Sequence, residues 1–127
     1  MIKKSSRDSK NYDLGERTFK FSQDLIRLCR KVKQDHITKS MVSQLIRAGT
    51  SIGANYCEAD SANSKKDFIN KISISKKEAN ETKYWIYLLK DSYGQLKPQC
   101  EELLKEIAEI GNMLGASVLT LKGKKKF

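Results

Sequence analysis

Residue types that do chemistry in enzymes are sparse in this chain. His36 is the single histidine, and any Ser-His-Asp or Cys-His arrangement would have to use it. It lies in a polar stretch that we expect to be an exposed loop, with no adjacent signature of a catalytic base. The chain contains neither a Glu-x-x-His pair for a di-iron site nor a glycine-rich nucleotide-binding motif. We therefore expect no catalytic residue, no metal ligand, no cofactor and no enzymatic activity.

The three cysteines, Cys29, Cys57 and Cys100, are widely spaced, and no C-x-x-C pair occurs. An odd number of cysteines without such a pair predicts neither a zinc site nor a disulfide framework. We expect these side chains to fill core or interface space rather than to react. This cysteine usage favours a reduced, cytoplasmic compartment.

Polar residues within two predicted helices form the first candidate functional cluster. Arg47, Asn55 and Glu58 lie on the second predicted helix, and Glu78 and Glu81 lie on the third. Polar groups beside apolar helix positions must be hydrogen-bonded if they are buried. We predict a structural network of Arg–Glu and Asn–Glu bonds that sets the register of the two helices. Contact with a ligand or with RNA is the alternative.

Four lysines of the third predicted helix form a second candidate, which we call the lysine ridge: Lys65, Lys76, Lys83 and Lys90. At 100° per residue they lie within about 20° of one another and roughly 70° from the centre of the apolar stripe. One interpretation is a solvated border whose aliphatic stems cover apolar surface. The other is a ridge that follows a phosphate backbone, and for it we expect no clearly interleaved aromatic side chain for base stacking.

The net charge of +10 is concentrated near the two ends of the sequence. Residues 1–12 contain four basic residues and one acidic residue, and residues 122–127 contain four lysines. Basic segments attract phosphate backbones without specifying a sequence, and solubilising ends are the alternative. We predict a basic N-terminal tail at 1–12 and a basic C-terminal tail at 122–127, with Lys124, Lys125 and Lys126 as candidate nucleic-acid contacts.

Segments with helical periodicity must position these side chains. The first begins at the N-cap Asp13, with Glu16 completing a capping box, and its pattern fades at residues 33–36. The second runs from about residue 38 or 40 to about residue 59, with apolar positions stepping by three and four.

Two further helices follow. The third begins at the N-cap Ser64 and continues to about residue 93, where Gly94 provides the stop. The fourth begins at Pro98, which suits a first helical turn, and its apolar stripe continues to about residue 121.

Small residues interrupt the apolar faces of the two middle helices. Residues 48–54 include two glycines, which are explained if a neighbouring backbone approaches closely; a kink is the alternative. Ser75, Ala79 and Thr82 make the centre of the third helix thin. We expect that thin centre to receive the small-residue run of the second helix.

These elements predict one all-α domain over residues 13–121, an up-down-up-down antiparallel four-helix bundle. No stretch approaches the ~20 apolar residues of a membrane span, so we expect no membrane contact. Phe19 and Ile26 project from the first helix away from its core stripe, and we predict that they contribute to an interface between copies of the chain. Scattered exposed apolar residues are the alternative interpretation.

Three motifs together resemble a known family. They are RAGTSIGANYCEA at residues 47–59, SKKDF at residues 64–68 and KEANETKYW at residues 77–85. In this combination the chain resembles, over residues 12–121, the bacterial four helix bundle protein family, also called the 23S rRNA intervening-sequence protein family. The matching positions are Arg47, Ser51, Asn55, Glu58, Asp67, Phe68, Glu78, Glu81, Tyr84 and Trp85. Cys57 and Asp60 depart from the residues usual in the family.

The resemblance implies an up-down bundle that assembles into a homopentamer and has no established catalytic residue. A relative, the accessory variability determinant of diversity-generating retroelements, binds a reverse transcriptase and nucleic acid. We therefore expect a non-enzymatic, oligomeric nucleic-acid-binding accessory factor, with RNA or DNA as a partner. The alternative is a scaffold that binds a reverse transcriptase or another protein without touching nucleic acid.

Overall fold

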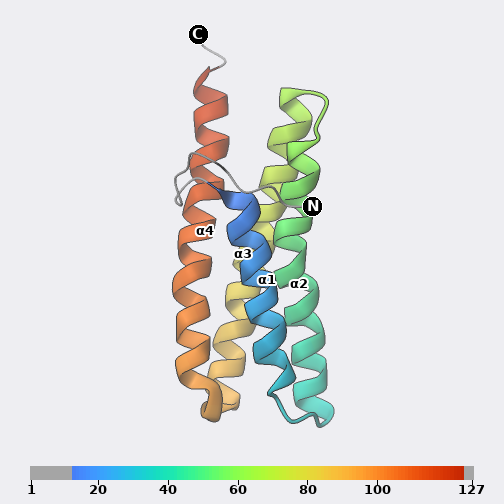
Figure 1. The fold of residues 1–127 in the computed structure, drawn as a ribbon, viewed down its shortest axis with the longest axis vertical. Helices are drawn as coiled ribbons and strands as arrows, with labels where there is room; N and C mark the ends of the chain where they lie inside the picture. Colours follow the sequence, from blue (N-terminus) through green and yellow to red (C-terminus); the bar gives the residue numbers. More distant parts are fainter. Residues whose placement is uncertain (1–12, 125–127) are drawn as a thin grey trace.

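The computed structural model describes the backbone of residues 13–124 and the side chains of residues 13–120. Four helices lie side by side, with consecutive helices antiparallel (Figure 1). They are α1 (Leu14–Arg30), α2 (His36–Asp60), α3 (Lys65–Ser92) and α4 (Lys97–Lys124), with a short 3-10 turn, η2 (Gly94–Leu96), between the last two. No strand occurs in residues 13–124. The predicted all-α four-helix bundle is confirmed.

Two predicted helix starts are confirmed by their caps. The Asp13 carboxylate accepts a hydrogen bond from the Glu16 backbone N–H at 3.0 Å, and the Ser64 hydroxyl accepts one from the Asp67 N–H at 3.0 Å. Side-chain acceptors at these positions satisfy N–H groups that the first helical turn leaves without a partner. Both caps lie within three residues of their targets, which is why local sequence predicts them.

α2 begins earlier than the sequence pattern predicts. Asp35 is its N-cap, and its carboxylate accepts from the N–H groups of Ile37 and Thr38 at 2.9 Å each. The Thr38 hydroxyl lies 2.8 Å from the Asp35 N–H and completes a capping box with threonine in place of glutamate. His36 is consequently the first residue of α2 and not a loop residue as expected, although its side chain is exposed.

α3 ends where the sequence pattern predicts, and α4 does not. Tyr93 is the C-cap of α3, directly before the predicted stop at Gly94, which begins η2 without a positive φ. The Leu96 N–H bonds to the Tyr93 carbonyl, three residues earlier, at 3.2 Å, so the helical pattern tightens into a 3-10 turn instead of reversing at a left-handed glycine. α4 continues through Lys124, beyond the boundary predicted near residue 121.

The core follows the predicted apolar stripes of all four helices. Its largest fully buried aliphatic and aromatic side chains include Phe21, Leu25, Leu45, Ile52, Ile72, Ile86, Leu89, Ile107, Ile110 and Leu114. Each such side chain contributes about 1.5–3 kcal/mol relative to an exposed position, before conformational entropy is subtracted. Within residues 13–124, no helix has both the length and the apolar character needed to cross a membrane.

Small residues let α2 approach both neighbours closely. On the α3 side, the buried Ser75 hydroxyl donates a hydrogen bond to the Ile52 carbonyl at 2.8 Å, as the thin centre of α3 predicts. On the α1 side, a Cβ added to Gly49 would lie 2.1 Å from Leu25 Cδ2, and one added to Gly53 would lie 3.2 Å from Thr18 Oγ1. The two glycines therefore mark a close approach and α2 runs on helically through them.

α1 is much shorter than the other helices, with 17 residues against 25 to 28. In Figure 1 its N-terminal end lies well below the α2–α3 connection and the C-terminal end of α4. A groove of about 650 Å³ lies at this end, and its lining includes Leu14, Tyr56, Phe68 and Met113. We call it the end groove.

Candidate functional site

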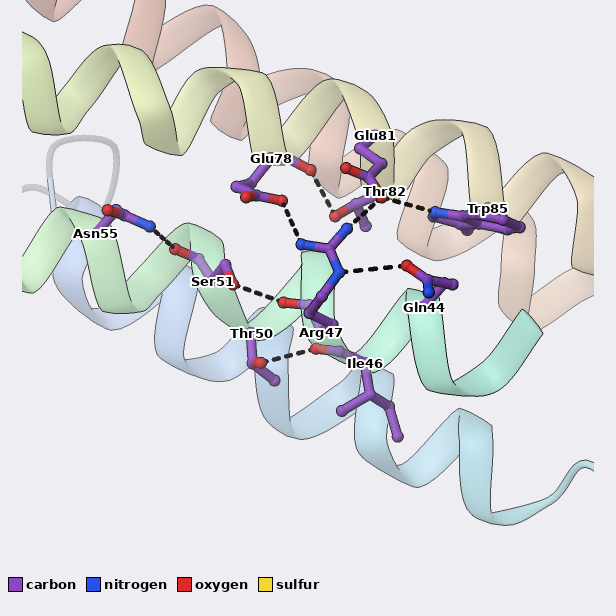
Figure 2. Close-up of polar contacts among 10 residues, drawn as sticks. All are labelled: Gln44, Ile46, Arg47, Thr50, Ser51, Asn55, Glu78, Glu81, Thr82 and Trp85. Atoms are coloured by element: carbon purple, nitrogen blue, oxygen red, sulfur yellow. Dashed lines mark hydrogen bonds and ion pairs between the residues drawn. The ribbon is translucent and has the colours of Figure 1, made fainter. Parts of the chain in front are cut away.

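Arg47 of α2 is the centre of the polar cluster between α2 and α3 (Figure 2). Its guanidinium donates to the Glu78 carboxylate at 3.3 Å and forms a close ion pair with Glu81. The same Glu81 oxygen accepts from Trp85 Nε1 at 3.0 Å, and Gln44 of α2 accepts from Arg47 Nε at 3.2 Å. The structure thus brings Arg47, Glu78 and Glu81 together as predicted.

Asn55 and Glu58 do not join this cluster. The Asn55 amide donates to the Ser51 carbonyl one turn earlier in α2, at 2.9 Å (Figure 2). Glu58 pairs with Lys71 of α3 at 2.8 Å, and this contact holds the pKa of Lys71 above its usual value. The predicted Asn–Glu bond is therefore absent from the described residues. Residues 55 and 58 share a face with Arg47, but they lie two and three turns farther along the helix.

The Arg47 cluster lies at the surface instead of in the interior. The Arg47 side chain is 45% exposed and that of Glu81 is 40% exposed. The hydrogen bond from Trp85 and the ion pair with Arg47 lower the pKa of Glu81, and the bond to Glu81 raises the pKa of Arg47. Because two carboxylates face this guanidinium, its charge is largely compensated within the protein.

The lysine ridge lies along the edge where α3 meets α4. Lys90 forms an ion pair with Glu101 of α4 at 3.3 Å. The half-buried side chain of Lys76 lies over two glycines of α4. A Cβ atom added to Gly111 would lie 3.5 Å from Lys76 Nζ, and one added to Gly115 would lie 3.6 Å from Lys76 Cε. Lys83 is half-buried, and Lys65 is exposed at the start of α3. Among the described residues, neither Lys76 nor Lys83 has an acidic partner within ion-pair distance.

Aromatic side chains do lie beside the ridge, contrary to expectation. Tyr84 and Tyr87 are 58% and 53% exposed on α3. The Lys90 ammonium lies 5.6 Å from the centre of the Tyr87 ring, and the Tyr84 ring meets the Trp85 ring edge-on at 5.2 Å. The spacing in the sequence could have predicted part of this arrangement. Tyr87 follows Lys83 by four residues and precedes Lys90 by three, which places all three side chains on one helical face.

Among the described residues, the others predicted to contact nucleic acid or a second copy of the chain lie on α4 and α1, outside the Arg47 cluster. Lys124 is the last helical residue of α4, and Lys125 and Lys126 lie outside the described residues. On α1, Phe19 is 44% exposed and Ile26 is half-buried. Both apolar side chains lie on a helix whose inner face is already filled by core residues.

An ion-pair cluster that the sequence reasoning missed links α1 to α4. Arg17 donates to both oxygens of Glu106, at 2.9 and 2.7 Å, and to Glu109 at 2.7 Å. Glu106 and Glu109 are three residues apart, so they share one face of α4 and can meet a single guanidinium. The spacing of the two glutamates is visible in the sequence, but their partner Arg17, which lies 89 residues before Glu106, cannot be inferred from it.

The other side chains that could take part in chemistry, the cysteines and potential metal ligands, do not gather at one place in the described residues. Cys29 and Cys100 are buried, and burial raises the pKa of the Cys29 thiol to about 11, whereas Cys57 is exposed. Within the described part of the chain, no three His, Cys, Asp or Glu side chains gather where they could hold a metal ion. The ridge with its tyrosines therefore remains the candidate site.

Comparison with known proteins is consistent with this architecture. Residues 10–116 match the model of the family described as 23S rRNA-intervening sequence protein. A solved structure from Bacteroides thetaiotaomicron, described as a protein of unknown function from the S23 ribosomal protein family, is 35% identical, with a TM-score of 0.75. The match covers 83% of this chain and 97% of that one. No curated protein matches the chain. The chain belongs to the 23S rRNA-intervening sequence protein family.

Proposed function

We propose that this protein is a non-enzymatic, cytoplasmic accessory factor that binds RNA or DNA as a homo-oligomer, with five copies as the expected number. The observation that carries the proposal is the lysine ridge on the α3–α4 edge. Lys76 and Lys83 have no acidic partner there among the described residues, and two exposed tyrosines adjoin the row. Unpaired cations in a row match the regular charge of a phosphate backbone.

The overall charge supports a polyanionic partner. The chain carries a formal charge of +10, and association into an oligomer would multiply it. A field of that size raises the rate at which nucleic acid meets the protein, and it makes the affinity fall steeply with salt because bound counterions are released. The Arg47 cluster contributes little to this field because its cation is compensated by Glu78 and Glu81.

Filter binding to a structured RNA at two salt concentrations tests the proposal. Changing all four ridge lysines to Glu should weaken binding strongly and flatten its salt dependence. The matched control changes Lys20, Lys31, Lys33 and Lys39 to Glu, which alters the net charge equally on exposed positions of α1, the α1–α2 connection and α2. Binding by the ridge variant as tight as that of the wild type would exclude the ridge, and equal losses in both variants would reduce the effect to net charge.

The end groove favours a second candidate function, a scaffold that binds a reverse transcriptase or another protein. Its walls include Leu14, Tyr56, Phe68 and Met113, and apolar grooves of this kind accept protein side chains. Affinity capture after nuclease treatment separates the two functions. A defined protein partner that survives the nuclease, together with no affinity for RNA or DNA at low salt, would favour the scaffold.

A further inference from the structure

Two large aromatic side chains stand exposed on one stretch of α3. Tyr84 and Tyr87 each leave more than half of their surface in water, although the inner face of the same helix buries Ile86 and Leu89 completely. They are three residues apart, so their side chains are neighbours on the helix surface. We call this pair the tyrosine pair.

The surroundings of the tyrosine pair hold the rings in place. The Trp85 ring meets the Tyr84 ring edge-on, and Trp85 is itself fixed by its hydrogen bond to Glu81. The Lys90 ammonium lies over the Tyr87 ring and is bonded to Glu101 of α4. Rings restrained in this way lose little further freedom when a planar ligand stacks on them, which favours binding.

Positive charge lies within one helical turn of the rings. Lys83 precedes Tyr87 by four residues and Lys90 follows it by three, so both ammonium groups border the tyrosine pair along the lysine ridge. Aromatic rings for the bases beside cations for the phosphates are the combination that binds single-stranded nucleic acid. The bases of a duplex are already stacked on one another, so an aromatic ring on the surface of a helix can stack only on unpaired bases. This excludes double-stranded nucleic acid as the ligand of these rings.

We propose that the tyrosine pair is a stacking platform for two unpaired bases, so that the nucleic acid bound at the α3–α4 edge is single-stranded. This inference rests on the proposed function and narrows its ligand to unpaired stretches of RNA or DNA, including the loops of a structured RNA. Lys83, which has no acidic partner among the described residues, neutralises a phosphate that flanks the stacked bases, and Tyr84 and Tyr87 contribute stacking, whose strength does not depend on salt.

The competing use of the tyrosine pair is an interface between copies of the chain. Tyrosine is common in such interfaces, but lysine is depleted from their centres. The tyrosine pair is bordered by Lys83, which has no acidic partner among the described residues, and by the exposed Asp91. An interface between copies would have to remove these charged groups from water, whereas nucleic acid supplies the counter-charge of Lys83.

Fluorescence anisotropy with a labelled 15-nucleotide oligouridine and with a duplex of equal length tests the proposal. The single strand should bind the wild type more tightly than the duplex. The double variant Y84A/Y87A should bind the single strand at least about 25-fold more weakly with an unchanged salt dependence, since two stacked bases are lost and each is worth roughly five- to 150-fold. Y84F/Y87F keeps both rings and should bind within about twofold of the wild type. I37A removes a large exposed apolar side chain from the start of α2, outside the predicted interface, and serves as the control.

Trp85 offers a second readout because it is the only tryptophan of the chain. The Tyr84 ring is in edge contact with the Trp85 ring, so a base stacked on Tyr84 lies close to Trp85. Oligouridine should therefore change the fluorescence emission of Trp85 in the wild type and should leave the emission of Y84A/Y87A unchanged. Light scattering must give the same mass for both proteins. A change of mass in Y84A/Y87A would assign the tyrosine pair to self-association and overturn the stacking proposal.

The outcomes separate this proposal from the function on which it rests. If Y84A/Y87A binds oligouridine as tightly as the wild type while the ridge variant with four glutamates loses binding, the stacking platform is wrong and nucleic-acid binding stands. Tighter binding of the duplex than of the single strand would likewise exclude the stacking platform alone. If the wild type binds neither nucleic acid at low salt, the proposed function itself has failed.

Discussion

At the residue scale, similar side chains have different roles because their partners differ. Arg47 and Lys83 both carry positive charge near the α3 surface. Arg47 is compensated by Glu78 and Glu81, whereas Lys83 has no acidic partner among the described residues. Arg47 therefore ties α2 to α3, and Lys83 is available to an external anion. Charge alone would have assigned them the same task.

The three cysteines should differ in reactivity for the same reason. Burial raises the pKa of Cys29 to about 11 and also raises the pKa of Cys100, whereas Cys57 is exposed on α2. The thiolate is the reactive form, so a thiol reagent at pH 8 should modify Cys57 rapidly and the other two only after unfolding. Colorimetric titration should count one thiol in the native protein and three in urea, and C57S should show none before unfolding. Rapid modification of C57S would contradict the packing of Cys29 and Cys100.

Glu81 should make stability depend on pH. Its pKa lies below the usual value of 4.5 because Trp85 and Arg47 both donate to its carboxylate. A group whose pKa is lower in the folded state stabilises the fold fully above its unfolded pKa, and that contribution disappears as pH falls through the folded pKa. Urea unfolding should thus show a smaller loss of stability below about pH 4.5 for E81Q than for the wild type. The loss of stability of W85F, which keeps the ion pair with Arg47, should lie between those of the other two proteins. Parallel pH profiles of stability for E81Q and the wild type would show that Glu81 does not couple folding to pH.

At the element scale, α2 is the helix on which the packing of the bundle depends. Gly49 and Gly53 admit α1 on one side, and the hydrogen bond from Ser75 to the Ile52 carbonyl fixes α3 on the other. α1 is held from its far side by Arg17, which binds Glu106 and Glu109 of α4. Each contact joins residues far apart in the chain and fixes how far one helix is displaced along another.

Two glycine-to-alanine changes should have opposite effects. A Cβ on Gly49 would lie 2.1 Å from Leu25 Cδ2 in a fully buried position, and overpacking of this kind costs about 1–3 kcal/mol. A Cβ on Gly111 would meet only Lys76 Nζ, at an ordinary 3.5 Å. Because alanine favours a helix over glycine by up to ~1 kcal/mol, G111A should be as stable as the wild type or more so. G49A should lose about 1–2 kcal/mol in urea unfolding, since that gain only partly offsets the clash. Equal stability of the two variants would show that Leu25 moves aside freely.

At the scale of the whole molecule, two features point outward. The short α1 leaves the end groove open beside Leu14, and the lysine ridge follows the opposite edge of α4, against α3. A protein partner suits the first surface and a polyanion the second. The exposed Phe19 lies apart from the lysine ridge, on α1, so self-association through α1 leaves the ridge accessible.

Assembly should therefore depend on α1. Light scattering of the wild type at micromolar concentration should give the mass of a homo-oligomer, and F19D/I26D should give a smaller mass because two apolar side chains of the proposed interface would be replaced by carboxylates, which are costly to bury. I37D alters a large apolar residue that is 69% exposed at the start of α2 and should retain the wild-type mass. A monomeric wild type, or an unchanged mass for F19D/I26D, would exclude this interface.

The sequence by itself determined the four helices, their inner faces and most of their starts. The caps at Asp13 and Ser64 act over three residues, and the apolar stripes repeat with the period of a single helix, so both are visible without any tertiary contact. The Asp35 cap was missed because threonine replaces the expected glutamate in its capping box.

Only the tertiary structure decided which side chains on those faces meet. Helical periodicity gives the direction of a residue around its own axis, but it does not give the displacement of one helix along another. That displacement is set by close contacts such as Gly49 with Leu25 and Ser75 with Ile52. It places Glu78 and Glu81, and not Glu58, opposite Arg47, and it seats Lys76 over the glycines of α4.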